Sequence, residues 1–238
     1  MEDKRRIIIV SDVHGCIEEF KELLDLINYK SPNVRAILLG DLIDRGPESA
    51  QCVKLARELD LECVKGNHEV KFLKWHKGNK HFDYPKYYDE FSDDDINYIN
   101  RMPLYIKLAE DFWILHAGVK SGIPLEKQKA NDLTYLRYND PDGKFVSVKK
   151  VARGEAPEAV FWTAYGSFGA TIVYGHEVHS LTDIRVDKFD DQTACYGIDT
   201  GACFGGRLSA IYFEDGKYVD LVQVQAKKEY AKYFGRNT

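Results

Sequence analysis

Polar side chains that could bind metal ions follow five short apolar runs of the chain. They supply imidazole nitrogens, carboxylate oxygens and one amide oxygen. These residues are Asp12, His14, Asp41, Asn67, His116 and His176. Imidazole and carboxylate ligands together suit Mn, Fe or Zn ions better than calcium, which prefers ligands that are all oxygen. Their number is sufficient for two cations that share one carboxylate, so the sequence indicates a two-metal centre.

The apolar runs that precede these residues have the character of buried β-strands. They are short, rich in aliphatic and β-branched side chains, and end in polar loops. They span residues 7–10, 36–39, 61–64, 112–115 and 171–174. Between the first three runs, residues 17–27 and 52–59 carry apolar side chains at helical spacing. We therefore expect an α/β fold whose polar loops gather at the carboxyl ends of the strands.

The composition is that of a globular protein. The 238 residues include 33 Lys and Arg against 38 Asp and Glu, which gives a formal net charge of −5, and 44% of them are hydrophobic. An acidic chain argues against strong non-specific binding to nucleic acid. The apolar runs are far shorter than the roughly 20 residues of a membrane-spanning helix, so we expect no membrane association.

The cysteines and the first residues indicate the compartment. The five cysteines are widely spaced and include no Cys-x-x-Cys pair. The charged first residues lead into no apolar segment of the kind found in a secretory leader. We therefore expect reduced thiols and a cytoplasmic protein.

The polar residues occur in five motifs that together resemble a known family. The motifs are DVHG (12–15), GDLIDRG (40–46), GNHE (66–69), HAG (116–118) and GH (175–176). In order and spacing they resemble the calcineurin-like metallophosphoesterases. More narrowly, they resemble the phosphoprotein phosphatase superfamily, whose bacterial relatives cleave diadenosine tetraphosphate. The resemblance implies one α/β domain over residues 1–238, built as a four-layer αββα sandwich of mixed sheets with a dimetal site at the carboxyl ends of strands.

The resemblance also implies which residue binds which ion. The expected ligands of the first ion are Asp12, His14 and Asp41, and those of the second are Asp41, Asn67, His116 and His176. Asp41 would therefore bridge the two ions. The ions are expected to be manganese, with iron, zinc or nickel as alternatives.

Four further residues receive catalytic or phosphate-binding roles from the resemblance. A hydroxide that bridges the ions would attack phosphorus in line, and His68, oriented by Asp44, would protonate the leaving oxygen. Arg45 and Asn67 would contact the phosphate. Arg137 lies where relatives often place a second phosphate-binding arginine. Considered alone, Arg45 could instead form a surface ion pair.

Two segments fall outside this strand-and-loop pattern. Residues 70–105 are rich in aromatic side chains and lysines and predict a mainly helical insertion. Its aromatic residues could stack on a nucleobase, but burial against the sheet is the favoured interpretation. Residues 120–165 predict a long, loop-rich connection. His179 has no counterpart in the expected pattern, and we interpret it as a turn residue.

Three functions are compatible with these residues. The first is a Ser/Thr protein phosphatase acting on phosphorylated protein, supported by the complete motif at 40–46. The alternative is a hydrolase of diadenosine tetraphosphate or other dinucleoside polyphosphates. The sequence of residues 198–208 resembles that of such hydrolases. A non-enzymatic scaffold that binds metal or phosphate is disfavoured, because it would not need the general acid His68 with its partner Asp44.

Overall fold

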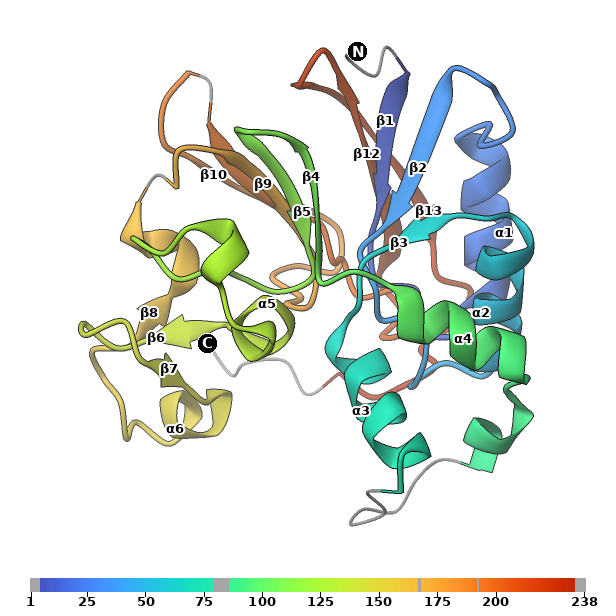
Figure 1. Cartoon of the computed structure of the whole chain (residues 1–238), viewed down its shortest axis with the longest axis horizontal. Helices are drawn as coiled ribbons and strands as arrows, with labels where there is room; N and C mark the ends of the chain where they lie inside the picture. Colours follow the sequence, from blue (N-terminus) through green and yellow to red (C-terminus); the bar gives the residue numbers. More distant parts are fainter. Residues whose placement is uncertain (1–4, 79–85, 167, 192, 234–238) are drawn as a thin grey trace.

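The computed structural model describes residues 5–78, 86–166, 168–191 and 193–233, which form two five-stranded sheets that face each other (Figure 1). The first sheet has the strand order β13-β12-β1-β2-β3. Its strands are β1 (Arg6–Val10), β2 (Val34–Leu38), β3 (Glu62–Cys63), β12 (Arg207–Glu214) and β13 (Lys217–Gln225). The first three strands are parallel, and β12 and β13 are antiparallel additions, so the sheet is mixed.

The second sheet is also mixed and has the order β10-β11-β9-β5-β4. Its strands are β4 (Tyr105–Ala109), β5 (Phe112–Leu115), β9 (Thr171–Tyr174), β10 (Arg185–Lys188) and β11 (Ala194–Gly197). The three central strands are parallel, and the two outer strands run antiparallel to their neighbours. The predicted α/β fold with mixed sheets is therefore confirmed.

The side chains of β1 show why its run is apolar throughout. Ile7 and Ile9 pack between the two sheets, together with Ile114 and Val173 of the second sheet. Ile8 points to the other face, into the core beneath the helices. Because successive side chains of a strand point to opposite faces, a strand with two buried faces must be continuously hydrophobic.

Helices cover the outer face of the first sheet (Figure 1). They are α1 (Ile17–Leu26), α2 (Ser49–Glu58), α3 (Asn67–His76), the 3₁₀ helix η1 (Lys86–Glu90) and α4 (Asp93–Arg101). The described part of the predicted insertion is thus helical. Its aromatic side chains Phe72, Trp75, Tyr88 and Phe91 are buried in the helix-facing core, as the favoured interpretation expected. Phe82 and Tyr84 lie outside the described residues.

The outer face of the second sheet is covered by short elements. They are η2 (Leu125–Lys127), α5 (Ala130–Tyr135), β6 (Tyr138–Asn139), β7 (Phe145–Val146), α6 (Val148–Ala152), β8 (Val160–Phe161) and η3 (Trp162–Tyr165). The three strands form a small sheet of order β7-β6-β8. The fourth layer of the sandwich therefore combines short helices with a small sheet, where the sequence predicted mainly loop.

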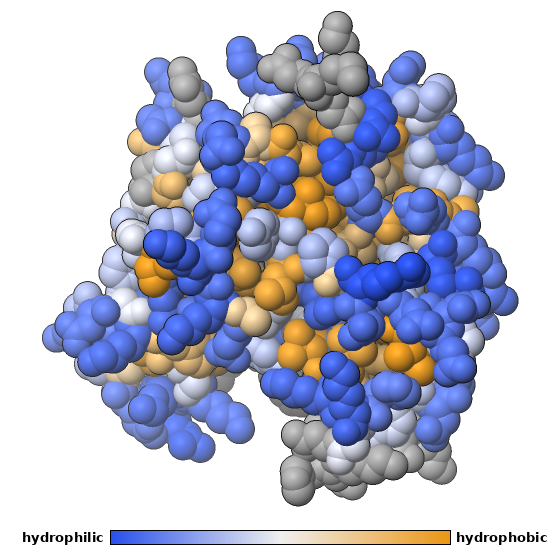
Figure 2. Space-filling model, in the orientation of Figure 1, coloured by the Kyte–Doolittle hydropathy of each residue, from blue (hydrophilic) through white to orange (hydrophobic). Residues whose placement is uncertain are grey.

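The surface in Figure 2 is hydrophilic around its edge and shows hydrophobic side chains toward its middle. All five cysteines are free and buried, which agrees with the expected reduced thiols. None of the helices in the described part of the chain has the length and apolar character needed to cross a bilayer.

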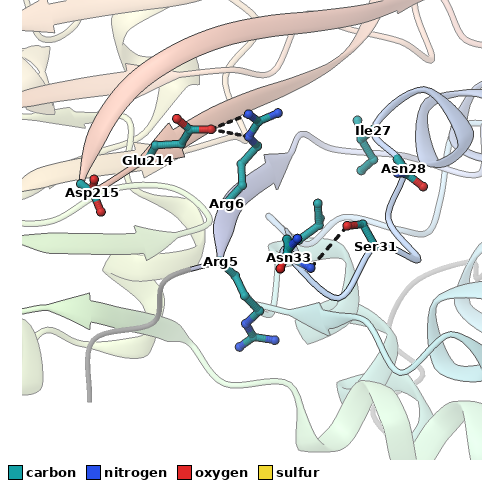
Figure 3. A pocket seen from close by; sticks show the side chains of 9 residues that line it. Arg5, Arg6, Ile27, Asn28, Ser31, Asn33, Glu214 and Asp215 are labelled. Carbon is teal, nitrogen blue, oxygen red and sulfur yellow. Dashed lines mark hydrogen bonds and ion pairs between the residues drawn. The ribbon is translucent and has the colours of Figure 1, made fainter.

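A small cleft of about 390 Å³ lies beside the amino end of β1 (Figure 3). Arg6 borders it and donates from Nε to Glu214 across 2.6 Å. This cleft is remote from the polar loops, which follow the opposite ends of the strands.

Candidate active site

The register of the parallel strands brings the polar loops together. In the first sheet, Val10 of β1 is level with Leu38 of β2, and Leu38 is level with Cys63 of β3. In the second sheet, Ile114 of β5 is level with Val173 of β9. The loops that follow these positions therefore start at the same height, as the sequence predicted for strand carboxyl ends.

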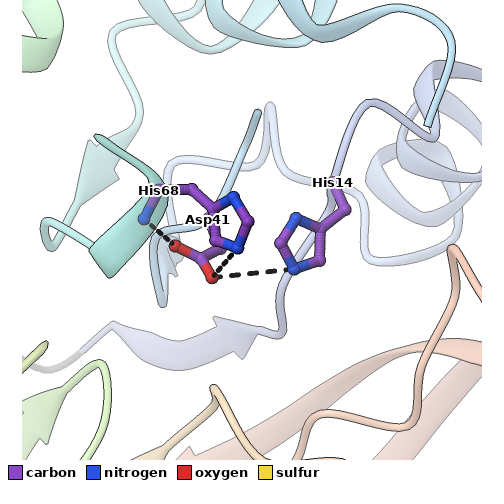
Figure 4. A group of neighbouring side chains, drawn as sticks. All are labelled: His14, Asp41 and His68. Atoms are coloured by element: carbon purple, nitrogen blue, oxygen red, sulfur yellow. Dashed lines mark hydrogen bonds and ion pairs between the residues drawn. The ribbon is translucent and has the colours of Figure 1, made fainter. Parts of the chain in front are cut away.

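One group of candidate ligands consists of His14, Asp41 and His68 (Figure 4). Asp41 Oδ2 lies 3.6 Å from His14 Nε2 and 3.8 Å from His68 Nε2. The backbone N–H of His68 donates to Asp41 Oδ1 across 3.0 Å. His14 Nδ1 lies 2.8 Å from the carbonyl oxygen of Ile43, so this nitrogen carries the proton and Nε2 presents its lone pair to Asp41.

A second group shares Asp41 and adds His116 and His176. His116 Nδ1 donates to the carbonyl of Leu39 across 2.8 Å, so in the neutral imidazole its Nε2 is an acceptor. This Nε2 lies 3.3 Å from Asp41 Oδ2, 3.0 Å from Asn67 Oδ1 and 3.2 Å from His176 Nδ1. Acceptor atoms that face one another at such distances repel unless a cation or a proton lies between them. The arrangement therefore fits a metal ion.

Unpaired polar atoms support the same conclusion. Asp12 is 1% exposed, and its Oδ2 accepts a hydrogen bond from the backbone of His176 across 3.0 Å. Among the described residues, neither Asp12 Oδ1 nor His176 Nε2 has a hydrogen-bond partner. A buried polar atom without a partner is costly, and a bound cation would remove that cost. Nitrogen and carboxylate donors of this kind suit Mn, Fe or Zn.

Two glycines leave the space in which these carboxylates lie. A Cβ atom on Gly175 would come within 1.9 Å of Asp12 Oδ1, and one on Gly66 within 2.1 Å of Asp41 Oδ1. Any larger residue at these positions would displace a candidate metal ligand. The Gly-His and Gly-Asn-His motifs therefore place glycine where only glycine fits.

The backbone of the site is strained. Five of its non-glycine residues adopt positive φ angles: His14 (46°), Asp41 (48°), Asp44 (69°), Arg45 (71°) and His176 (67°). Such left-handed conformations cost about 1–3 kcal/mol each and concentrate at functional sites, where the surrounding structure enforces them.

Electrostatics differ sharply between neighbouring histidines. Burial lowers the pKa of His14 to about 3, and the nearby His68 acts in the same direction. Burial also disfavours a charged His116, but the Asp41 carboxylate outweighs it and raises the pKa of His116 to about 9. Burial raises the pKa of Asp12 as well, assisted by Asp199. The buried carboxylates of Asp12 and Asp41 thus favour positive charge in their surroundings.

Asp44 and His68 form a hydrogen-bonded pair beside the first group. His68 Nδ1 lies 2.5 Å from Asp44 Oδ2. Two tyrosines of the insertion also donate to this carboxylate, Tyr87 to Oδ1 and Tyr88 to Oδ2 at 3.2 Å. Burial opposes the charged form of Asp44, but the hydrogen bonds from His68 and Tyr87 outweigh it and lower the pKa of this carboxyl group. Sequence reasoning missed both tyrosines, because they look like ordinary core aromatics.

Glu69 connects the loop after β2 with the loop after β3, and it was not identified as a site residue from the sequence. This residue is fully buried and accepts hydrogen bonds from the backbone N–H groups of Asp41, Leu42 and Gly66 at 2.8, 2.9 and 2.9 Å. It ties the start of α3 to the loop after β2. Its place in the GNHE motif was the available signal.

The two arginines expected to bind phosphate both line a cleft of about 810 Å³. Arg45 is exposed, and its guanidinium lies 4.8 Å from the centre of the Phe204 ring. Arg137 pairs with Glu177 and also donates to the carbonyl oxygen of His176 across 2.8 Å. Arg137 is therefore held directly beside a candidate metal ligand.

The same cleft contains residues that sequence reasoning did not single out. The further cationic and aromatic side chains that line it are Lys149, Phe204, Lys232 and Tyr233. His179, interpreted as a turn residue, also lines the cleft, and its Nε2 lies 3.5 Å from the hydroxyl of Tyr174. These residues come from segments far apart in the sequence, so no local motif marks them.

Comparisons with known proteins identify the family of the chain. The family model for calcineurin-like phosphoesterases matches residues 5–206. A bis(5'-nucleosyl)-tetraphosphatase PrpE (asymmetrical) from Oceanobacillus iheyensis is 30% identical over 247 aligned positions, which cover 92% of this chain and 93% of the relative. A symmetrical bis(5'-nucleosyl)-tetraphosphatase from Erwinia tasmaniensis is 26% identical, covering 87% of this chain and 93% of the relative.

Solved structures share the fold. A crystal structure provisionally assigned as a diadenosine tetraphosphatase superposes with a TM-score of 0.77 at 23% identity, covering 98% of this chain and 96% of the other. A protein serine/threonine phosphatase from Saccharomyces cerevisiae gives a TM-score of 0.60 at 15% identity, covering 95% and 81%. The chain therefore belongs to the calcineurin-like phosphoesterases, a family of metal-dependent hydrolases of phosphoric esters.

Proposed function

We propose that this phosphoesterase hydrolyses dinucleoside polyphosphates such as diadenosine tetraphosphate. The composition of the cleft beside the two candidate metal groups carries the proposal. Arg45, Arg137, Lys149 and Lys232 line this cleft together with aromatic side chains. Several cations suit a chain of several phosphates better than the single phosphate of a phosphoserine.

The relatives support the same substrate class. The curated relatives described above are tetraphosphatases, and they match almost the whole of this chain. The Ser/Thr phosphatase function that the motif at residues 40–46 favoured first is therefore less well supported than its alternative. Apart from Arg45, that motif lies in the metal core, which would act on the phosphoryl group, whereas the cleft beside the core would contact the rest of the substrate.

The proposed metal ligands are the members of the two groups except His68, together with Asp12 and Asn67. Asp12, His14 and Asp41 would hold one ion, and Asp41, Asn67, His116 and His176 the other. Bound divalent ions would supply Lewis acidity and neutralise charge at the phosphoryl group. We favour manganese among the ions that suit these donors. We also place the protein in the cytoplasm, in keeping with its free, buried cysteines.

His68 would deliver a proton to the leaving oxygen. Its Nδ1 is held by Asp44, so its Nε2 is the atom available for proton transfer, and this atom faces Asp41 at the centre of the site. Arg45 and Arg137, which line the same cleft, would bind phosphoryl oxygens, and so would Asn67, whose Oδ1 lies 3.0 Å from His116 Nε2. A general acid contributes about 10²–10⁴-fold, so the metal ions and the arginines would provide most of the acceleration.

A substrate panel tests this function. Purified protein with Mn²⁺ is offered diadenosine tetraphosphate, a phosphoserine peptide, a chromogenic phosphomonoester and a 3′-phosphorylated oligonucleotide. We expect the highest kcat/KM for the dinucleotide, with the nucleotide products resolved by ion-exchange chromatography. Asp41→Asn protein purified in parallel controls for contaminating phosphatases. Rapid dephosphorylation of the peptide, with the dinucleotide intact, would overturn the proposal in favour of a protein phosphatase.

A further inference from the structure

The chain after β13 folds back against the loop that precedes β12. We name residues 226–233 the C-terminal strap. It runs near the carboxyl ends of the parallel strands of the first sheet (Figure 1). The backbone N–H groups of Tyr230 and Ala231 donate to the carbonyl oxygen of Cys203 across 3.0 and 2.8 Å. The N–H of Ala226 donates to Gly206 across 2.9 Å. These bonds fix the strap beside Phe204.

A buried carboxylate in α1 anchors the strap from the other side. Glu19 is fully buried, and its Oε1 accepts hydrogen bonds from the N–H of Lys227 and the hydroxyl of Tyr230, both at 2.8 Å. Burying a carboxylate is costly unless hydrogen bonds satisfy it. Both bonds go to Oε1, while Oε2 has no hydrogen-bond partner among the described residues. The two bonds therefore offset part of the cost of burying Glu19, and they tie the strap to α1.

The anchored strap places Tyr233 at the cleft. The rings of Tyr233 and Phe204 lie 5.1 Å apart at an angle of 45°, and the guanidinium of Arg45 lies 4.8 Å from the centre of the Phe204 ring. The Tyr233 hydroxyl donates to the carbonyl of Val178 across 3.1 Å, which bridges the strap to the loop after β9. Tyr233 is 39% exposed, and Lys232 beside it also lines the cleft.

We infer that Phe204 and Tyr233 form a subsite for the nucleobase of a nucleotide substrate, with Lys232 beside the phosphate chain. The inference rests on the proposed function. A nucleotide presents a flat aromatic base a short distance from anionic phosphate, and the subsite places aromatic rings next to the arginine expected to bind phosphate. Stacking on aromatic side chains tolerates any base. The subsite would therefore select nucleotides without selecting one particular base.

Variants of Tyr233 test the subsite. Removing the ring in Tyr233→Ala should lower kcat/KM for diadenosine tetraphosphate about tenfold more than kcat/KM for a chromogenic phosphomonoester, mainly through KM. Tyr233→Phe keeps the ring and loses only the hydroxyl, so it should retain most of the preference. Tyr218→Ala, which alters a tyrosine of similar exposure on β13, should change neither value. Equal losses on both substrates in Tyr233→Ala, or no loss on the dinucleotide, would overturn the inference.

A second measurement separates failure of the subsite from failure of the proposed function. AMP and ribose 5-phosphate are compared as competitive inhibitors of chromogenic ester hydrolysis. For the wild-type protein, the inhibition constant of AMP should be about tenfold lower than that of ribose 5-phosphate. In Tyr233→Ala the two inhibition constants should be equal. If the wild type does not cleave diadenosine tetraphosphate, the proposed function fails, but the two inhibition constants still decide whether a base is bound. Equal constants in the wild type would refute the subsite.

Discussion

The candidate metal ligands and the rim of the cleft are held in different ways. Asp41 and His116 are 1% and 0% exposed; His116 follows β5 directly, and Asp41 follows β2 after two residues. Arg45 is exposed and Tyr233 is 39% exposed, and both lie on irregular segments. The candidate metal ligands, which we call the inner residues, are positioned by sheet register. The rim of the cleft, which includes Arg45 and Tyr233, is assembled from separate loops and the C-terminal strap. We therefore expect substitutions of the metal ligands to lower the hydrolysis of every phosphoester. Substitutions at the rim should change the hydrolysis of different substrates to different extents.

The largest effect is expected at the residue shared by both metal groups. Asp41→Asn should lower kcat more than about 10⁴-fold on all substrates, beyond what loss of a general acid could cause. The protein should also retain less metal after dialysis, measured by mass spectrometry. Asp142→Asn, at an exposed turn with its side chain 74% accessible, serves as the matched control. Near-normal turnover in Asp41→Asn would show that this candidate metal ligand is not required for hydrolysis.

The second largest effect is expected at His68. His68→Asn should lower kcat about 10²–10⁴-fold for esters with a poor leaving group, and less for an activated aryl ester, because a good leaving group needs no proton. A series of phosphomonoesters with graded leaving-group pKa values measures this dependence. His76→Asn, at the exposed end of the same helix, should behave like the wild type. An equal loss across the series would show that His68 is not the acid.

A smaller, substrate-dependent effect is expected at Arg137. Arg137→Gln should raise KM for diadenosine tetraphosphate about tenfold, because a charged hydrogen bond to phosphate contributes about 1.5–3 kcal/mol. The KM for a chromogenic monoester should rise less. Arg153→Gln, whose side chain is 69% accessible and pairs with Glu155, is the control. A rise of the same size for both substrates would place Arg137 with the inner residues.

The smallest effect is expected at Tyr87, which contacts the inner site from the insertion. Tyr87→Phe removes one hydrogen bond to Asp44, and its net value of about 0.5–1.5 kcal/mol predicts a loss of about two- to tenfold in kcat on esters with poor leaving groups. Tyr98→Phe removes a comparable hydroxyl, which donates to Leu61 away from the site, and should leave the leaving-group dependence unchanged. Identical behaviour of the two variants would contradict a positioning role for Tyr87.

The inner site could be predicted from the sequence because its information is local. Most candidate ligands follow a short run that is buried on both faces, as in β1, and such runs identify central strands without any knowledge of the fold. The exception is β3, which precedes Asn67, lies at the edge of its sheet and has Glu62 exposed. Parallel strands then bring their carboxyl ends together. The structure accordingly places Asp12, His14, Asp41, Asn67, His116 and His176 around one space, while their roles as ligands stay predictions.

The rim and the support of the inner site could not be predicted in the same way. The small sheet has strands of two residues, which are too short to show a period of two. Tyr87 and Tyr88 reach Asp44 only because the insertion folds back on the first sheet. The strap is positioned by Glu19, a residue that looks like a surface charge on α1. A related reason explains why the protein phosphatase function was chosen first and is now less well supported than the dinucleoside polyphosphate hydrolase. The sequence motifs identify the metal core, whereas the choice of substrate would depend on the rim.

Anomalous diffraction from crystals grown with Mn²⁺ tests directly whether these residues hold two metal ions. We expect two manganese peaks that share Asp41, one beside Asp12 and His14 and the other beside His116 and His176. A single peak, or peaks that lie away from Asp41, would contradict a two-metal site built by these residues.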